Sequence, residues 1–308
     1  MELNVTLLGT GAGSPSKDRN VGMGININFN GENYLFDPAE NSQQLLMKAG
    51  ISIMKINNIF ISHFHADHFL GLPGLIATMN MLERKEPLKI YGPKKIKDYV
   101  KKMTELAVMK PNFEIKCIEL KKGVAVENES SEISAFPLKH SAVCFGFSFK
   151  EKDSKGKFNR EKAIKLGIPV GPLFSKLQNG ESIKLQGKTI KPEMVLDKKK
   201  KKIGRKISFV PDNELKEESY VKEIKDSDLL IHESVFLENQ KGEALKKKHS
   251  TALKAGKIAE KAKVKTLVLT HFSSRYKTTD ELIKEAKKKF KNTIAGNDLM
   301  KIEVKRNV

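Results

Sequence analysis

Histidine is scarce in this chain, yet three of its seven histidines fall within residues 63–68, HFHADH, directly after the apolar segment 59–62. Alternate residues that leave the end of a strand can direct the imidazoles of His63 and His65 at one point, while Asp67 and His68 reach a neighbouring point. Neutral imidazole and carboxylate are the ligands that zinc and other borderline divalent cations prefer. The motif therefore predicts a metal site at the end of a buried strand.

Three further segments place a polar group at the end of an apolar run. His140 follows SAFPLK, Asp212 follows ISFVP and His271 follows TLVLT. Each residue alone is typical of an ordinary loop, but with the first cluster they supply the seven donors that two cations bridged by a carboxylate require. A single zinc site and a surface cluster without metal are the alternatives.

Charge restricts the class of partner. The 308 residues include 57 basic and 37 acidic side chains, which gives a net charge of +20 and a pI near 9.7, and lysine carries most of the excess. Such a field attracts polyanions and favours nucleic acid or an anionic surface. A lysine-rich proteome is the alternative explanation.

The sequence also indicates the compartment. It contains no run of 18 apolar residues, so no membrane-spanning helix is expected. The segment MELNVTLLGTGAG has no basic region followed by an apolar one, unlike a secretory signal. Cys117 and Cys144 lie in strand-like segments outside any CxxC pair, which predicts two core thiols in a cytoplasmic protein.

Alternating apolar residues predict strands on both sides of a central segment, and helices are expected at 41–49, 94–107, 250–262 and 279–291. This mixture is typical of layered α/β sheets flanked by helices. The run Gly9, Gly11 and Gly13 is similar to a dinucleotide-binding loop, but the third glycine is misplaced and a polar, proline-containing stretch follows. A tight turn is the better interpretation.

Residues 151–202 have a different composition. They are rich in glycine, proline and lysine, with 15 basic and six acidic residues, or +9, where an even spread would give about +3. We expect an inserted, protruding basic arm at 151–202 between the two parts of a core, 1–150 and 203–308. A disordered linker is the alternative, but apolar residues predict some packing: Ile164, Leu166, Ile168, Leu173, Phe174 and Leu177.

Several segments resemble a known family. HFHADHFLGLPGL at 63–75 resembles the metallo-β-lactamase superfamily signature in the version found in short-form tRNase Z (ribonuclease Z). The resemblance covers nearly the whole chain, although Ser-Val stands in LLIHESVF where the family has Ala-Thr, and Pro211 precedes Asp212 where a smaller residue is usual. The other matching segments are PSKDRN (15–20, the PxKxRN loop), GIPVGPLFSKLQNG (167–180, the exosite arm), LLIHESVF (229–236), HST (249–251) and HFSSRY (271–276).

The resemblance implies an αβ/βα sandwich of two facing sheets with helices outside, assembled as a homodimer. It also assigns ligands for two divalent cations, with zinc expected: one group holds the first cation, a second group holds the other, and Asp212 bridges them. The first group is His63, His65 and His140, and the second is Asp67, His68 and His271.

The resemblance also implies roles outside the ligand set. Asp67 is positioned to accept the proton of the attacking water, and His249 to protonate the leaving oxygen or bind phosphate. Lys17 and Arg275 are candidates for phosphate contacts. The ordinary alternatives are a helix-start residue for His249 and solvated surface charges for the two cations.

The implied activity is that of an endoribonuclease that removes the 3′ trailer from precursor tRNA by metal-hydroxide attack on a phosphodiester. The products are a tRNA 3′-hydroxyl and a 5′-phosphate on the trailer, and the basic arm at 151–202 grips the tRNA. A hydrolase of a small ester, thioester or lactam fits the same ligands, but would not use the arm or the PxKxRN and HST segments. An RNA-binding module with structural metals is disfavoured because Asp67 offers a carboxylate beside an open metal position.

Overall fold

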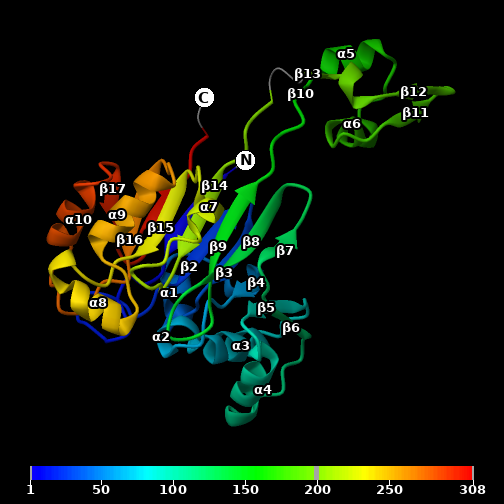
Figure 1. The fold of residues 1–308 in the computed structure, drawn as a ribbon. Coiled ribbons are helices and arrows are strands. Elements are labelled where there is room, and N and C mark those ends of the chain that lie inside the picture. The colour runs from blue at the N-terminus through cyan, green and yellow to red at the C-terminus, as the bar shows by residue number, and fades with distance from the viewer. Residues whose placement is uncertain (1, 198–200, 307–308) are drawn as a thin grey trace. The chain divides into compact units, whose positions relative to one another are not determined.

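The computed structural model describes residues 2–197 and 201–306 (Figure 1). The chain separates into two compact units. Among the described residues, the core unit comprises 2–127, 132–149 and 206–305, and the insert unit comprises 128–131, 150–197, 201–205 and 306.

The core unit contains two mixed sheets of seven strands each. In the first sheet, β3 to β6 are parallel, and β18, β1, β2 and β3 pair antiparallel. Its strand order is β18 (Lys301–Glu303), β1 (Leu3–Leu7), β2 (Ile25–Phe29), β3 (Glu32–Phe36), β4 (Ile56–Phe60), β5 (Leu88–Gly92) and β6 (Ile115–Glu119).

The second sheet has a parallel half, β14 to β17, and an antiparallel pair of β7 with β8. The strands of the parallel half are short apolar runs buried on both faces, as expected for strands covered on both sides. The order is β17 (Thr293–Ala295), β16 (Thr266–Thr270), β15 (Leu229–Glu233), β14 (Lys206–Val210), β9 (Cys144–Glu151), β8 (Ser131–Leu138) and β7 (Gly123–Glu127).

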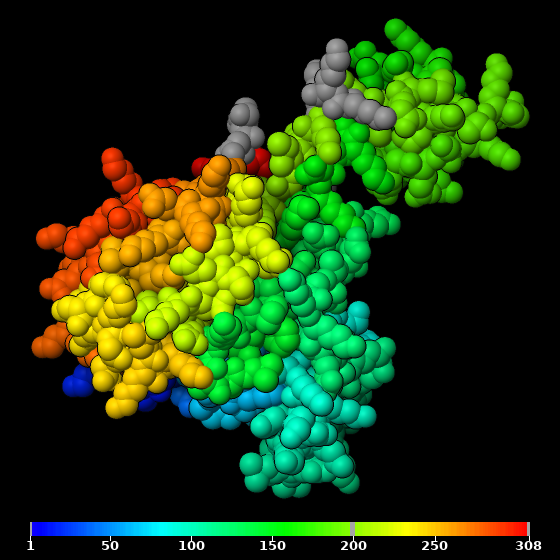
Figure 2. All heavy atoms as spheres, in the orientation of Figure 1, coloured from blue at the N-terminus to red at the C-terminus, as the bar shows by residue number. Residues whose placement is uncertain are grey.

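Helices cover the outer face of each sheet, so the predicted αβ/βα sandwich is confirmed (Figure 1). The predicted helices at 41–49, 94–107, 250–262 and 279–291 are present as α1, α4, α9 and α10. In Figure 2, α8 to α10 form part of the outer surface of the core unit. The helices are α1 (Ser42–Lys48), α2 (Ala66–Phe69), α3 (Leu72–Met81), α4 (Ile96–Leu106), α7 (Val221–Ile224), α8 (Lys241–Lys247), α9 (Ala252–Lys261) and α10 (Asp280–Lys287), with 3₁₀ turns η1 (Ile53–Lys55) and η4 (Glu238–Gln240).

An aromatic cluster fills the space between the two sheets. Phe36 and Phe60 of the first sheet stack at 4.8 Å between ring centroids. Phe147 of β9 packs on Phe60 at 5.7 Å and on Phe209 of β14 at 6.4 Å. Each of these rings is almost completely buried, which is worth about 1.5–3 kcal/mol per side chain. The cluster holds the sheets face to face.

The insert unit has its own small core, built by Ala163, Val195 and the residues packed around them. Two predicted anchors, Ile168 and Leu177, are buried in it, and Leu166, Leu173 and Phe174 pack against it. Ile164 is 51% exposed, so its prediction as an anchor is wrong: it lies on the outer face of α5. The elements are α5 (Arg160–Lys165), α6 (Pro172–Gln178), η2 (Pro192–Met194), the pair β10 (Lys157–Phe158) with β13 (Leu196–Asp197), and the hairpin β11 (Ile183–Leu185) with β12 (Lys188–Ile190).

The two cysteines differ in burial. Cys144 is buried in β9 as predicted, whereas Cys117 in β6 is only half-buried. The reason is that β6 is the edge strand of the first sheet. Both thiols are free. Within residues 2–197 and 201–306, no helix combines the length and apolar character needed to cross a bilayer.

We expect Phe147→Ala to lower the free energy of unfolding by about 3–5 kcal/mol, because it opens a cavity among Phe36, Phe60 and Phe209. Met47→Ala is the control, since Met47 is 70% exposed and should change stability by less than about 0.5 kcal/mol. Urea titration followed by circular dichroism measures both. Equal midpoints for the two variants would contradict the assigned core.

Candidate metal centre

The predicted ligands lie at the carboxyl ends of strands from both sheets. His63 and His65 follow β4, and the short helix α2 carries Asp67 and His68. The other three follow β8, β14 and β16 in the second sheet: His140, Asp212 and His271. Because these strand ends meet at one edge of the sandwich, residues up to 204 positions apart come into contact.

The first group of donors gathers around one oxygen of Asp212. Oδ2 of Asp212 lies 3.6 Å from Nε2 of His63 and 3.4 Å from Nε2 of His140. Nδ1 of His65 lies 3.2 Å from Nε2 of His140. One donor atom from each of the four residues lies within 4.8 Å of the others.

The second group gathers around the other oxygen of Asp212. Oδ1 lies 3.0 Å from Nδ1 of His271 and 3.7 Å from Nε2 of His68. Oδ2 of Asp67 lies 3.1 Å from Nε2 of His271 and 3.6 Å from Nε2 of His68. The carboxylate of Asp212 therefore stands between two clusters and offers one oxygen to each.

The orientation of three imidazoles fits cation binding. Nδ1 of His63 donates to Ser62 Oγ (2.9 Å), Nδ1 of His68 to Asp37 Oδ2 (2.9 Å) and Nδ1 of His140 to the backbone oxygen of Lys248 (2.9 Å). When such a ring is neutral, its Nε2 carries the lone pair and faces the site. Such outer hydrogen bonds fix the tautomer of metal-binding histidines.

Unpartnered buried atoms point to the same conclusion. Among the described residues, four buried atoms of the cluster make no hydrogen bond: His63 Nε2, His68 Nε2, Asp212 Oδ1 and His271 Nδ1. The last two lie 3.0 Å apart but not in hydrogen-bond geometry. Buried polar atoms are rarely left in this state. Ligands bound at about 2.0–2.1 Å in tetrahedral positions stand about 3.3 Å apart, close to the spacing observed here. The donor set fits a pair of divalent cations.

The electrostatics of the cluster also favour a cation. Burial alone would lower the pKa of His68, but the carboxylates of Asp212 and Asp67 raise it to about 10. Burial would raise the pKa of Asp67, yet the imidazoles of His68 and His271 hold it well below its usual range. The pKa of Asp212 is likewise far below its usual range, despite burial, because imidazoles led by His271 and His249 surround it. Ionised carboxylates therefore dominate the site and attract positive charge.

Asp37 supports the cluster and was not predicted from the sequence. It follows β3, is fully buried, and accepts from the backbone N–H of Ser62 (2.7 Å), from Ser62 Oγ (2.6 Å) and from His68. It thus links the loop after β4 to the ring of His68. The sequence did carry a signal for Asp37. Like the predicted ligands, it directly follows an apolar run, here YLF.

Glu233 was also missed, although the segment that contains it was noted. It ends β15, is fully buried, and accepts from the backbone N–H of Asn213 (3.0 Å) and Ser250 (2.9 Å). Nδ1 of His249 lies 3.3 Å from Glu233 Oε1 and 3.8 Å from Asp212 Oδ2. Burial would lower the pKa of His249, but Asp212 and Glu233 raise it to about 9.

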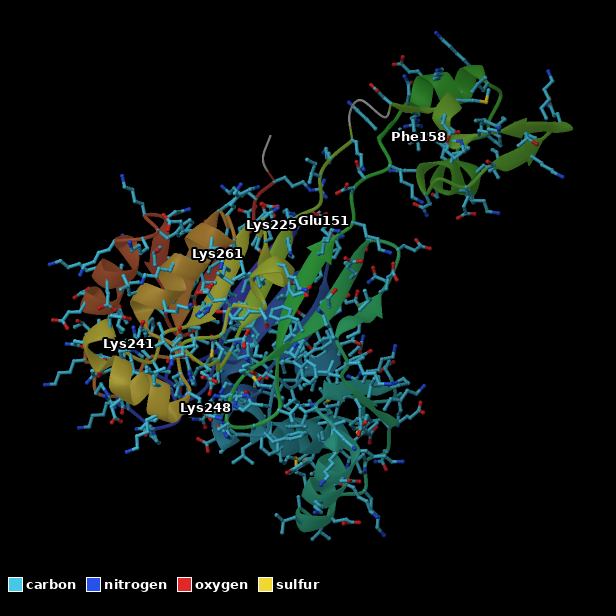
Figure 3. All side chains as sticks on the ribbon, in the orientation of Figure 1. Glu151, Phe158, Lys225, Lys241, Lys248 and Lys261 are labelled. Carbon is cyan, nitrogen blue, oxygen red and sulfur yellow. The ribbon has the colours of Figure 1, made fainter. Side chains whose placement is uncertain are left out.

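His249 follows α8, whose last residues are basic. Lys248 adopts a left-handed conformation (φ 56°) at the end of this helix, and its backbone oxygen accepts the hydrogen bond from His140. Figure 3 labels Lys248 at this end of the helix. The turn at Lys248 therefore positions both imidazoles: His140 through this hydrogen bond, and His249 as the next residue in the chain.

The loop with the predicted tight turn borders the cluster. Gly13 lies so close to Asp67 that an added Cβ would stand 3.5 Å from its Oδ2. Further along, Arg19 Nη1 donates to the backbone oxygen of Tyr276 (2.9 Å). Lys17 on this loop is exposed and makes none of the contacts that join the seven donors.

Arg275 is exposed beside the same loop. Its guanidinium lies 4.8 Å from the ring centroid of Phe236, and its Nε donates to Ser273 Oγ (3.0 Å). These contacts hold the side chain in one direction while its outer nitrogens stay accessible. Like Lys17, it lies outside the donor cluster.

Comparison with known proteins gives extensive similarity to ribonucleases Z. Ribonuclease Z of Methanosarcina acetivorans is 42% identical over 303 residues, 98% of each chain. Ribonuclease Z of Archaeoglobus fulgidus is 42% identical over 279 residues, 90% of each chain. The structure of human tRNase Z, short form (ELAC1), matches with a TM-score of 0.69 and 27% identity, covering 98% of this chain and 99% of that one.

Two further similarities are more limited. The metallo-beta-lactamase fold protein YhfI from Bacillus subtilis has a TM-score of 0.71 at 18% identity, covering 98% of this chain and 100% of that one, so it shows the shared fold alone. A sequence-family profile described as "Anti-Pycsar protein Apyc1" matches residues 3–154.

We expect Asp212→Asn to reduce the divalent cation retained after gel filtration to less than half of that in the unsubstituted chain, because both donor groups lose the shared anionic oxygen. Elemental analysis of the purified proteins measures it. Asp98→Asn, on the exposed face of α4, is the control and should retain the full amount. Equal retention in both variants would contradict the assignment of Asp212.

Proposed function

This chain belongs to the ribonuclease Z family, and we propose that it is a metal-dependent endoribonuclease that removes the 3′ trailer from precursor tRNA. The observation that carries the proposal is the pair of donor groups sharing Asp212, in a chain that matches a curated ribonuclease Z along 98% of its length. A fold of this kind hosts several chemistries, so the site rather than the sandwich supports the assignment.

The proposed cofactors are two divalent cations per chain, with zinc as the expected ion. The first would be held by His63, His65 and His140, the second by Asp67, His68 and His271, with Asp212 between them. When bound, such a pair lowers the pKa of a shared water and offsets the negative charge that develops on the phosphodiester. The Nε2 atoms of His63 and His140 suit this role, because burial lowers the pKa of both rings.

The acid–base work falls to Asp67 and His249. In this proposal Asp67, whose Oδ2 belongs to the second donor group, accepts the proton of the attacking water. Glu233 accepts a hydrogen bond from Nδ1 of His249, which leaves Nε2 to donate a proton to the leaving oxygen. With the 3′ oxygen of the tRNA as the leaving group, the polarity that the family resemblance implies, the products are a tRNA 3′-hydroxyl and a 5′-phosphate on the trailer.

Lys17 and Arg275 are the proposed phosphate contacts. Both are exposed, and the stacking of Arg275 on Phe236 (4.8 Å) reduces the side-chain freedom lost on binding. Phosphate contacts of this kind set the register of the RNA and carry no base specificity.

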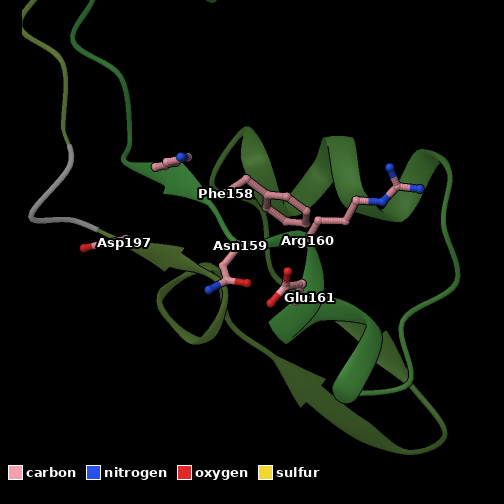
Figure 4. Close-up of a pocket in the computed structure, with 6 residues that line it drawn as sticks. Phe158, Asn159, Arg160, Glu161 and Asp197 are labelled. Atoms are coloured by element: carbon pink, nitrogen blue, oxygen red, sulfur yellow. The ribbon is translucent and has the colours of Figure 1, made fainter.

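The insert at 151–202 is the proposed tRNA-binding arm. Its charge of +9 suits a shaped polyanion, because lysines that contact phosphates give affinity without reading sequence. Lys157, Arg160 and the ring of Phe158 line a pocket of about 310 Å³ in this unit, together with Asn159, Glu161 and Asp197 (Figure 4). Paired basic and aromatic side chains are typical contacts for RNA.

We also propose a cytoplasmic homodimer. Exposed apolar side chains at the ends of α3 and α4 support self-association: Met81 is 82% exposed, Leu106 88% and Val108 90%. The two free thiols and the processing of tRNA fit the cytoplasm.

Asp67→Asn is expected to reduce cleavage of a labelled precursor tRNA at least about 1,000-fold, because it removes both a ligand and the proton acceptor. Binding of the RNA, followed by a gel shift, should stay within about threefold, since the basic surface is unchanged. Mapping the cut to the nucleotide, with and without chelator, tests the reaction. Wild-type cleavage in the variant would remove Asp67 from the mechanism.

Deletion of 155–197 is expected to raise KM for precursor tRNA at least about tenfold, because the phosphate contacts of the insert are lost. Hydrolysis of bis(p-nitrophenyl) phosphate, which reaches only the metal centre, should be unchanged. In the intact chain, KM for precursor tRNA should also rise steeply with salt. A KM indifferent to the deletion and to salt would instead favour a hydrolase of small esters.

A further inference from the structure

Two segments of the insert unit, one entering it and one leaving it, are joined side by side. We call residues 151–154 and 201–205 the stalk. The backbone N–H of Glu151 donates to the backbone oxygen of Arg205 (2.8 Å), and that of Ser154 to Lys202 (2.9 Å). The backbone N–H of Lys202 donates in turn to Ser154 Oγ (2.7 Å).

A second set of contacts tightens the stalk. Asp153 accepts from the backbone N–H of Gly204 (2.9 Å) and pairs with Lys201 (2.9 Å). A Cβ on Gly204 would stand only 1.7 Å from the backbone oxygen of Glu151. The two segments therefore approach so closely at this point that only glycine fits.

The carboxylate of Glu151 lies at the base of the stalk, where β9 ends (Figure 3). It is fully buried, and its Oε2 accepts from Nε of Arg205 (2.8 Å). Its Oε1 accepts from Nη2 of Arg306, which comes from the segment after β18. Burial alone would raise the pKa of Glu151, but the hydrogen bonds from the two arginines lower it. Glu151 is thus an ionised carboxylate held between two guanidinium groups.

The buried group of Glu151, Arg205 and Arg306 is better suited to fixing the geometry of the stalk than to stabilising the fold. A buried ion group often contributes no more net stability than apolar side chains of the same volume, although removing one partner is costly. Arginine forks hold carboxylates in a defined direction, which a lysine does not. The residues that close the stalk, Glu151, Arg205 and Arg306, are therefore placed to make it stiff.

Stiffness matters if one RNA molecule binds at two places. In the proposed function, the insert holds the tRNA body while the metal centre holds the scissile phosphate, so the second contact is intramolecular. Its effective concentration depends on how far the connecting segment restricts the search. We propose that Glu151 and Arg306 are positioning residues that close the stalk and thereby tighten the binding of precursor tRNA; this inference rests on the proposed function.

Arg306→Ala is the first test. We expect KM for precursor tRNA to rise about tenfold, with kcat within twofold and with hydrolysis of bis(p-nitrophenyl) phosphate unchanged. Lys305→Ala is the matched control, because it removes the same charge from the neighbouring residue, whose side chain is 77% exposed. It should leave KM within twofold.

Gly204→Ala is the second test, since it opens the stalk without changing charge. It should raise KM in the same way, and amide hydrogen exchange at Ser154 should quicken in both Gly204→Ala and Arg306→Ala. An unchanged KM and an unchanged rate of amide exchange in both variants would overturn the proposed role of the stalk. The same KM increase in Lys305→Ala would also overturn it, because general charge would then explain the effect.

Different results would contradict the proposed function and the proposed role of the stalk. If the unsubstituted chain does not cleave precursor tRNA, the proposed function is wrong. If the unsubstituted chain cleaves precursor tRNA and Arg306→Ala has the same KM, only the proposed role of the stalk is wrong. If Arg306→Ala slows the small phosphodiester as much as the tRNA, the residue acts on the metal centre or the whole fold, and the positioning role is overturned.

Discussion

The site depends on one carboxylate, that of Asp212, which presents a different oxygen to each of two donor groups. Asp212 is buried at the end of β14 in the second sheet, while most of the other donors come from the loop after β4 in the first. The two sheets must therefore face each other at a fixed distance for the groups to meet. The aromatic cluster of Phe60, Phe147 and Phe209 provides that constraint.

The surrounding polar groups hold the imidazole rings of the metal centre in one orientation. Hydrogen bonds to Nδ1 orient three rings so that each Nε2 faces inward. The partners are Asp37 for His68, Ser62 for His63 and the backbone oxygen of Lys248 for His140. Glu233 holds His249 through its Nδ1, which lies 3.3 Å from Glu233 Oε1. Buried carboxylates are unfavourable without partners, and Asp37 and Glu233 each accept several hydrogen bonds. The cost of burying them is offset by preorganising the ligands for a cation.

Much of the fold and the site could be predicted because the signals were local. HFHADH lies within six consecutive residues, and the amphipathic helices carry their own periodicity. Asp37 and Glu233 show the same strand-end pattern and could have been found. The group of Glu151, Arg205 and Arg306 could not, since it joins segments 155 positions apart and no motif marks it. Ile164 was misassigned because an apolar residue in a short helix gives no sign of which face it occupies.

The most direct test of the account is anomalous diffraction at the absorption edge of the metal, from crystals of the protein purified without chelator. The account predicts two peaks: one within bonding distance of His63, His65 and His140, the other within bonding distance of Asp67, His68 and His271, with Asp212 touching both. No peak, or one peak remote from Asp212, in protein that cleaves precursor tRNA would contradict it.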